Sequence, residues 1–285
     1  LATIDDAVTA IISSTLAHFI ANWACLREID EPESIHQMRI ALRRMRCALS
    51  IFNRALPNTG FGTLRNDAGR LASAFGPVRN ADAIRISVVE GPLASADCSE
   101  NSDALRGIME KRRIAAYASA HSEIESIAAT LFVLNMQSFL VHGDWREGAK
   151  PKMPTRKFFK AELSRLRGRV LKRGKVADVS DQARHKLRIA LKNLRYGVDF
   201  FDLFGNGKRR QAYKKRMSAL QDLLGLRNDF VVAQTYLKEL REETGPEAEQ
   251  ILEFIRGWYA RDATAADKAI GKSLKKFKRT EPFWN

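Results

Sequence analysis

The sequence predicts an all-α fold built from two helical bundles, and three observations lead to this class. Apolar residues recur at helical spacing in most segments, whereas no segment shows the alternation of a strand. The helical segments are long and the breaks between them are short, which is typical of bundles. Two motifs also recur at one offset, because His36 aligns with His185 and Gly76 with Gly225, 149 positions on in both cases. We interpret the chain as a tandem duplication with a pseudo-twofold axis.

The first half comprises residues 1–148. A helix is expected over 3–26, where apolar residues follow helical spacing from Ile4 to Trp23. After a break at 30–34, Ser34 is expected to be the N-cap of a second helix that ends at the break 56–62. Further helices are expected at 63–75, at about 81–90, and at 102–142 as one long or two stacked helices.

Residues 143–154 are the expected linker, since they combine Gly, Pro and charge without periodicity. The second half, 149–285, repeats the scheme, and the whole chain 1–285 is expected to form a single domain. Helices are expected at 155–173, 181–204, 208–224, 228–243 and 246–277.

Two Gly-containing breaks interrupt these helices. Gly76 and Gly225 are each expected to end a helix in the left-handed conformation, and Asn80 or Asn228 to cap the helix that follows. A carboxylate comes early in each following helix, where it favours the helix dipole and is a candidate for pinning an arginine by a charge-assisted bond. These carboxylates are Asp82 and Asp229.

The composition is strongly basic. The chain has 48 Lys and Arg against 33 Asp and Glu, a formal net charge of +15. Such a charge favours a polyanionic partner. The candidate partners are nucleic acid, an anionic membrane surface and a phosphate polymer. We expect no apolar run to approach the roughly 20 residues that span a bilayer, and we therefore expect a cytoplasmic protein with no membrane partner. Cys25, Cys47 and Cys98 lack metal-type spacing and are expected to be free, buried thiols.

Two helices carry basic stripes. At about 100° per residue, the basic side chains of each fall within a quarter of the helix circumference, opposite the apolar face. A solvated charged face usually mixes signs, whereas no acid lies between Ser34 and Asn66 or within 182–198. Because aligned cations repel one another, we interpret the stripes as an anion-binding site rather than a solvated face. The stripes are His36, Arg39, Arg43 and Arg46, and His185, Arg188, Lys192 and Arg195.

The two histidines lead the stripes, where each can hydrogen-bond an anion or shape the floor of a groove. Neither has a second His, Cys or carboxylate at ligand spacing on its own helix face, so we expect no metal. As nucleophiles for phosphoryl transfer they lack an orienting acid nearby in the sequence. We therefore expect no catalytic residue and no cofactor.

The pattern His-x-x-Arg-x-x-x-Arg/Lys-x-x-Arg, present twice, resembles the CHAD family (conserved histidine α-helical domain). IHQMRIALRRMRCAL and RHKLRIALKNLRYGVDF correspond to the two signature helices of that family. FGPVRNAD and LLGLRND are similar to its two Gly-containing turns, and KKFKRTEPFW is similar to its usual C-terminus. One departure is Asn80, where the family usually has Asp directly after the Arg, and this leaves the local pairing open.

The resemblance implies a compact all-helical fold of two four-helix bundles that binds inorganic polyphosphate in a basic groove. It implies a non-catalytic targeting module, located in the cytoplasm or at polyphosphate granules. Other polyanions are further candidate partners because of the net charge. Some members are fused to a CYTH triphosphatase domain, so a fused or associated triphosphatase-type domain outside this chain is a further implied partner. The implied ligand-facing residues are His36, Arg39, Arg43, Arg46, His185, Arg188, Lys192 and Arg195, with Arg65 and Lys214 as further candidates from the next helix.

The alternative function is nucleic-acid binding through the same basic faces. Proteins that bind single strands usually stack bases on aromatic side chains, and only Tyr196 lies beside a stripe. A phosphate polymer has no bases and requires only guanidinium and ammonium groups. The basic runs 111–113, 208–216 and 272–279 are expected to be solvated surface.

Overall fold

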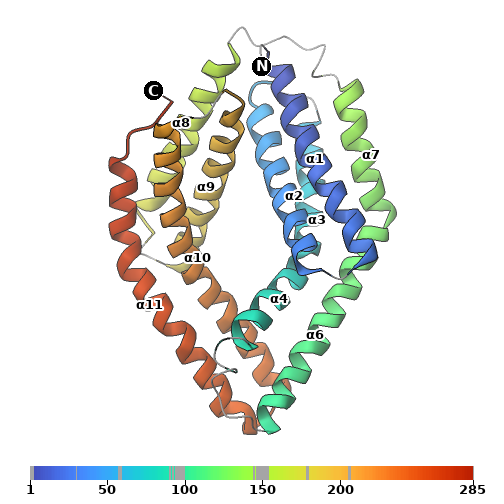
Figure 1. Ribbon diagram of the computed structural model, residues 1–285, viewed down its shortest axis with the longest axis vertical. Coiled ribbons are helices and arrows are strands. Elements are labelled where there is room, and N and C mark those ends of the chain that lie inside the picture. Colours follow the sequence, from blue (N-terminus) through green and yellow to red (C-terminus); the bar gives the residue numbers. More distant parts are fainter. Residues whose placement is uncertain are drawn as a thin grey trace.

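The computed structural model describes residues 3–29, 31–56, 60–89, 91, 93, 100–143, 145, 154–177, 180–204 and 207–284. Regular structure in these ranges is helical throughout, which confirms the predicted all-α class. Figure 1 shows the helices of the two halves side by side, converging at the ends of α4, α6, α10 and α11. Cys98, expected to be a free thiol, lies outside the described residues.

The first half begins with a well-capped helix. The Thr3 hydroxyl accepts a hydrogen bond from the Asp6 amide, and the Asp6 carboxylate accepts one from the Thr3 amide. The second helix begins at Pro32, whose fixed φ suits a first turn, so the prediction that Ser34 is its N-cap is wrong. The helices are α1 (Ile4–Glu28), α2 (Pro32–Phe52), α3 (Phe61–Ala74), α4 (Gly76–Val89), α6 (Glu100–Glu125) and α7 (Ile127–His142).

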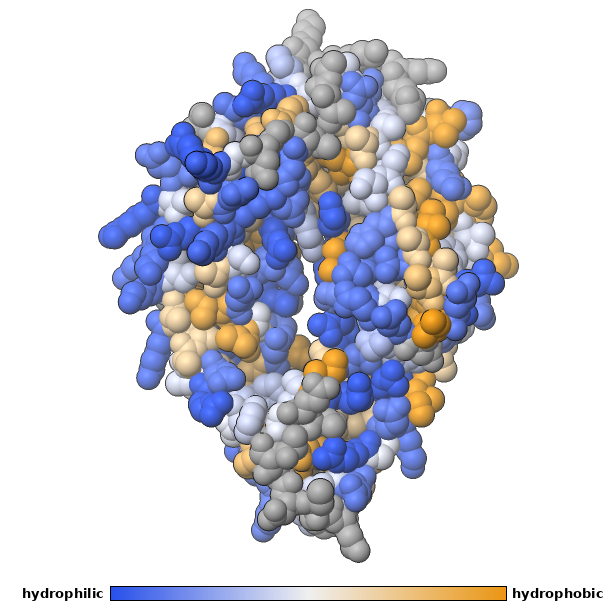
Figure 2. Space-filling view, in the orientation of Figure 1, coloured by the Kyte–Doolittle hydropathy of each residue, from blue (hydrophilic) through white to orange (hydrophobic). Residues whose placement is uncertain are grey.

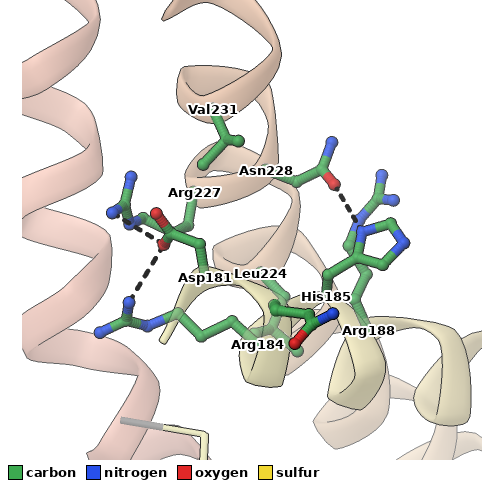
Figure 3. A pocket seen from close by; sticks show the side chains of 9 residues that line it. Asp181, Arg184, His185, Arg188, Leu224, Arg227, Asn228 and Val231 are labelled. Atoms are coloured by element: carbon green, nitrogen blue, oxygen red, sulfur yellow. Dashed lines mark hydrogen bonds and ion pairs between the residues drawn. The ribbon is translucent and has the colours of Figure 1, made fainter. Parts of the chain in front are cut away.

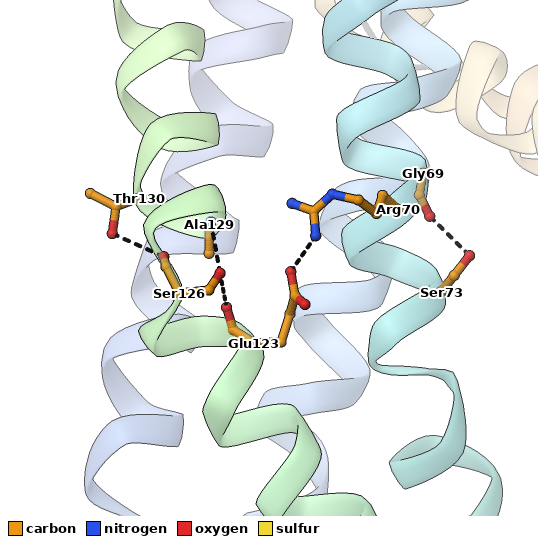
Figure 4. Close-up of polar contacts among 7 residues, drawn as sticks. All are labelled: Gly69, Arg70, Ser73, Glu123, Ser126, Ala129 and Thr130. Atoms are coloured by element: carbon orange, nitrogen blue, oxygen red, sulfur yellow. Dashed lines mark hydrogen bonds and ion pairs between the residues drawn. The ribbon is translucent and has the colours of Figure 1, made fainter.

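The expected helix at 102–142 is two helices, α6 and α7, bent by 49° at Ser126. The Ser126 hydroxyl accepts a hydrogen bond from the Ala129 amide and donates one to the Glu123 carbonyl, so one side chain serves both helix ends (Figure 4). Arg70 of α3 forms an ion pair of 2.5 Å with Glu123 beside this bend. The bend is therefore built from side-chain contacts and contains no proline or glycine.

The second half contains a long helix that the sequence did not predict. The helices expected at 208–224 and 228–243 are one continuous helix, because Gly225 lies inside α10. The left-handed glycines of the described residues are Gly60 and Gly245, so the predicted left-handed conformation of Gly76 and Gly225 is wrong. The second-half elements are α8 (Thr155–Gly174), α9 (Asp181–Phe200), the 3-10 helix η2 (Phe201–Phe204), α10 (Lys208–Glu243), the 3-10 helix η3 (Pro246–Ala248) and α11 (Glu249–Arg279).

The two halves pack together at one end through α2 and α8. The ring of Phe52 lies 6.5 Å from that of Phe158 and 6.0 Å from that of Phe159, measured between centroids. Beside these rings, Arg54 forms a 2.9 Å ion pair with Glu162. The three phenylalanines belong to the main hydrophobic core, which includes side chains from both halves.

A second, smaller hydrophobic cluster joins the halves at the other end. Ile84 and Val88 of α4 and Met109 of α6 belong to it together with Leu237 of α10 and Leu252 of α11. The halves are thus joined at two separate places. Between these places an opening passes through the molecule, and hydrophilic residues lie on both sides of it (Figure 2).

The structure corrects one expectation about apolar segments and one about the cysteines. Helix α1 is long and apolar enough to cross a membrane by length and composition, with a mean hydropathy of 1.3 over 18 residues, and α6 with α7 passes the same test as a bent pair. Ile12 and Phe19 of α1 nevertheless lie in the main core. Cys25 is exposed rather than buried, whereas Cys47 is buried as expected and burial raises its pKa to about 12.

Candidate functional site

Helices α2 and α9, which carry the two basic stripes, lie next to each other in the centre of the molecule (Figure 1). Arg43 Nε donates a hydrogen bond of 3.4 Å to the Tyr196 hydroxyl. The Cys47 thiol lies 3.5 Å from the Asn193 carbonyl oxygen, to which it donates. These two contacts fix the register of α2 against α9, and the register brings the stripes together.

Four cations from the stripes form what we call the central cluster, namely Arg39, Arg43, Arg188 and Lys192. Burial, followed by the charges of Arg188 and Arg43, lowers the pKa of Lys192 to about 7. Burial, followed by Arg43, lowers the pKa of Arg39 to about 10. The pKa of Arg188 is also lowered by burial, against the opposing effect of Asp229. The pKa values of Arg39, Arg188 and Lys192 are thus all lowered, because burial and neighbouring cations disfavour their charged forms.

Arg39 is anchored at its tip as well as by its helix. It donates a hydrogen bond to the Ala72 carbonyl in the last turn of α3, where unpaired carbonyl groups favour a cation. A Cβ atom at Gly76 would lie only 3.3 Å from Arg39 Nη1, so the glycine leaves room for the guanidinium. Gly76 therefore has a packing role in the site rather than the predicted role of a left-handed turn.

The two histidines differ in their surroundings. His36 is half-buried, and burial followed by the charge of Arg79 lowers its pKa. His185 is exposed, and its Nδ1 lies 3.3 Å from the Asn228 side-chain oxygen. Arg79 and Asn228 are themselves 149 positions apart, so corresponding positions in the two halves contact the histidines with different chemistry. Asn228 lies inside α10 and does not cap a helix, contrary to prediction.

The His185 side of the site contains a cavity of about 190 Å³ between α9 and α10 (Figure 3). Asp181 accepts ion pairs from Arg184 at 3.2 Å and from Arg227 at 2.8 Å. Arg188 lines the same cavity beside His185. The two outer arginines are thus neutralised by protein carboxylates.

Asp82 and Asp229, the two carboxylates predicted to pair with stripe arginines, differ in their burial and in their contacts. Asp82 is buried, with 1% exposure, and accepts from Arg113 at 3.0 Å and from the Tyr117 hydroxyl at 2.9 Å. It therefore joins α4 to α6 and contacts no stripe residue in the described contacts. Asp229 is exposed and acts electrostatically on Arg188 and Lys192, but the described contacts include no charge-assisted bond from it to a stripe arginine.

The remaining predicted residues lie farther out. Arg46 and Arg195 are exposed at corresponding positions, and Arg46 packs over Gly69 of α3. Arg65 is exposed on α3. Lys214 forms ion pairs with Asp199 at 2.8 Å and Asp202 at 2.6 Å, so its charge is balanced by protein carboxylates.

Two residues of the site, Arg79 and Arg227, are not among the predicted ones, and Tyr196 was noted only as an aromatic residue beside a stripe. Arg79 is a charged neighbour of His36, and Arg227 lines the cavity below His185. Tyr196 is buried and presents only its hydroxyl to Arg43. The 149-residue offset could have indicated Arg79, because Arg79 aligns with Asn228 and each of them lies beside the histidine of its own half. Arg227 aligns with Val78 at that offset, so the repeat gave no signal for it.

Metal binding has no support in the described ranges, which contain no group of three or more His, Cys, Asp or Glu side chains placed to hold an ion. A larger cavity, of about 580 Å³, adjoins the central cluster at Gly76 and lies between α4, α6 and α10. Its wall includes Ile84, Val231 and Val232. The cation of this wall, Arg112, is paired with Glu239 at 3.2 Å and with Glu243 at 2.6 Å.

The fold and the central cluster define an all-α protein in which two joined halves bring four cations together between α2 and α9. The family model of the CHAD domain matches residues 10–238, and the chain belongs to the CHAD domain family.

Solved structures agree with this assignment. The crystal structure of the CHAD domain from the plant Ricinus communis is similar with a TM-score of 0.81 and 27% identity, over 96% of this chain and 92% of that one. PptA from Streptomyces chartreusis has the same fold, with a TM-score of 0.75 and 13% identity, over 96% of this chain and 100% of that one. None of the curated proteins compared matches the chain.

Proposed function

We propose that this protein binds inorganic polyphosphate between α2 and α9 and catalyses no reaction. The observation that supports this most directly is the convergence of Arg39 and Arg43 with Arg188 and Lys192, in which burial and mutual repulsion lower the pKa of Lys192 to about 7. A bound polyanion relieves this repulsion, since each phosphate places negative charge beside several cations. The free energy that this repulsion costs the unbound protein is thus recovered when a polyanion binds.

The chemistry of the cluster fits a phosphate polymer better than a nucleic acid. Polyphosphate has about one negative charge on each phosphate and no bases, so it requires cations but no stacking surface. Arginine provides bidentate contacts to phosphate oxygens, and lysine adds a compact point charge. Tyr196, the aromatic residue beside the cluster, is buried and offers no exposed ring face for a base.

The outer stripe residues extend the proposed binding track. His36 and His185 lie one turn before Arg39 and Arg188, and Arg46 and Arg195 lie beyond the cluster toward the other helix ends. Arg65 on α3 adds an exposed charge. Lys214 is left out of the proposed track because Asp199 and Asp202 already neutralise it.

Membership in the CHAD domain family supports the same proposal, since the family resemblance implies polyphosphate binding. In the cell this activity would place the protein at cytoplasmic polyphosphate granules. A fused or associated triphosphatase-type domain outside this chain would supply any hydrolysis.

The proposal is tested by the double variant Arg39→Glu with Arg188→Glu. Its affinity for long-chain polyphosphate, measured by calorimetry at several salt concentrations, should fall by at least about a hundredfold, because two attractive contacts become repulsive. The matched control is Arg209→Glu with Arg261→Glu, which makes the same change in net charge at positions that are 72% and 73% exposed. This control should lose far less affinity than the cluster variant.

A single-stranded RNA of matched charge provides the second arm. We expect RNA binding to be lost at lower salt than polyphosphate binding, since RNA gains no stacking here. Equal losses of polyphosphate affinity in both double variants would contradict a specific site. RNA affinity equal to that of polyphosphate at every salt concentration would contradict polyphosphate specificity and favour the nucleic-acid function.

A further inference from the structure

Helix α7 presents an uncharged apolar surface to the outside of the molecule. Ile127, Leu131, Leu134 and Val141 are 78%, 49%, 52% and 61% exposed. Their spacing of four, three and seven residues keeps them within a narrow stripe at about 100° per residue. It is the spacing of a coiled-coil seam, in which such side chains interlock with those of another helix.

The opposite side of α7 is already packed against its own chain. Phe132, Met136 and Phe139 belong to the main core, where Phe139 stacks edge-on against Phe61 of α3 with 4.9 Å between ring centroids. The exposed stripe is therefore additional to what folding requires. Four of the large apolar side chains that are exposed in the described residues lie on this one helix of 16 residues. Exposed apolar side chains that are scattered singly need no explanation, whereas four in one stripe form a patch.

Helix α1 packs beside α7 and continues the uncharged surface. Its outward residues include the small side chains Ser14, Ala17 and Ala21, all exposed. Neither residues 7–26 nor residues 127–142 contain any Asp, Glu, Lys or Arg, in a chain of which 28% is charged. Figure 2 shows apolar colouring over this side of the molecule, where α1 and α7 lie. We call this surface the α1–α7 face.

We propose that the α1–α7 face joins two copies of this chain in a symmetric dimer. Charge selects this face, because two molecules of net charge +15 repel wherever their basic surfaces meet, and an uncharged face allows close approach. A face that pairs with its own copy also needs no complementary patch elsewhere on the molecule.

The size of the face fits this occupant. The uncharged stretches 7–26 and 127–142 are about 30 Å and 24 Å long, and two packed helices are about 20 Å wide. The face therefore covers roughly 500–550 Å² in projection. Its accessible area is larger because side chains make it rough, and a stable interface needs about 800 Å² from each partner. The α7 stripe supplies the large side chains of such an interface, and the small residues of α1 allow close helix approach.

The test is the oligomeric state of the chain by sedimentation velocity over a wide range of protein concentration, without polyphosphate. We expect a dimer that dissociates on dilution, and we expect the variant Leu131→Glu with Leu134→Glu to be monomeric throughout. The matched control is Phe254→Glu, which places a charge on an apolar side chain of α11 that is 45% exposed and lies in the other half. The control should remain dimeric, and circular dichroism should show equal helix content for all three proteins.

Three outcomes would overturn the proposal. The first is a wild-type chain that stays monomeric at all concentrations. The second is a dimer that persists in the α7 double variant. The third is a monomer that co-sediments with vesicles of zwitterionic lipid and loses this binding in the same variant, which would assign the face to a membrane surface. None of these results depends on polyphosphate affinity, so the dimer and the proposed function can fail separately.

Discussion

Protonation of Lys192 should make polyphosphate affinity depend on pH near neutrality. In the free protein the pKa of Lys192 is lowered to about 7 by burial and by Arg188, Arg43 and Arg39, with Asp229 acting in the opposite direction. Bound phosphates add negative charge and raise this pKa again. Above pH 7 the free protein carries a neutral Lys192, so binding has to take up a proton.

The expected magnitude follows from this linkage. Below about pH 7 Lys192 is charged in both free and bound protein, and its protonation adds no pH dependence. Above that pH the affinity should fall by up to about tenfold per pH unit, or about 1.4 kcal/mol, until the pKa of the bound state is reached. A group that has to lose a proton on binding would instead make the affinity rise with pH.

The assay is calorimetric titration with long-chain polyphosphate from pH 6.5 to 9 at constant salt, in buffers of different ionisation enthalpy that report proton uptake. Lys192→Arg is the matched control, because arginine keeps its charge over this range and occupies the equivalent position, Arg43, in the first half. It should bind with little pH dependence. Parallel pH profiles for wild type and Lys192→Arg would refute the role of Lys192, since titration of the polymer affects both alike.

Four further predictions concern packing and the limits of the site. Gly197→Ala should destabilise the fold by about 1–3 kcal/mol in urea unfolding, because its Cβ would lie 2.9 Å from the buried Leu166. Gly225→Ala should instead stabilise by about 0.5–1 kcal/mol, since it lies within α10 with open space around it. Asp82→Asn should cost about 2–3 kcal/mol through the loss of its buried charge beside Arg113, whereas Asp229→Asn should change stability by less than about 0.5 kcal/mol, and equal effects would contradict the different roles of the two carboxylates. Lys214→Gln should leave polyphosphate affinity within about twofold, and a larger loss would return Lys214 to the binding track.

The helical class and most helix positions were predictable because apolar spacing is a local property. The expected helices at 155–173 and 181–204 agree closely with α8 and with α9 plus η2. Helix ends were less predictable, since they depend on which nearby group caps the chain. Ser34 is a good N-cap by residue type, yet Pro32 starts the helix two residues earlier.

Gly225 shows why local rules failed inside α10. A glycine in a helix costs only about 1 kcal/mol, and packing on both sides of it offsets that cost. Buried Leu220 and Leu224 of the main core precede Gly225, and buried Leu237 and Leu240 of the smaller cluster follow it on the same helix. The sequence contains these residues, but it does not show that they contact two different hydrophobic clusters that a single helix must connect.

Within the site, the stripes were predictable and their partners were not. Repeat spacing indicated that Arg39 and Arg188 occupy equivalent positions, but the contact between Arg43 and Tyr196 joins residues 153 positions apart. Likewise, Asp82 and Asp229 are both carboxylates early in the segment after a glycine, and only the fold shows that one is buried with Arg113 and the other is exposed. The duplication itself stays an interpretation of the sequence.

The two separate junctions between the halves have a consequence for how the cations hold their positions. If the halves met at one end only, mutual repulsion would swing α2 away from α9 and the charges would separate. The Phe52 contacts at one end and the Leu237 cluster at the other resist that hinge motion. The cations are thus preorganised, so an entering anion meets them already in place, and little of its binding energy is lost in reshaping the protein.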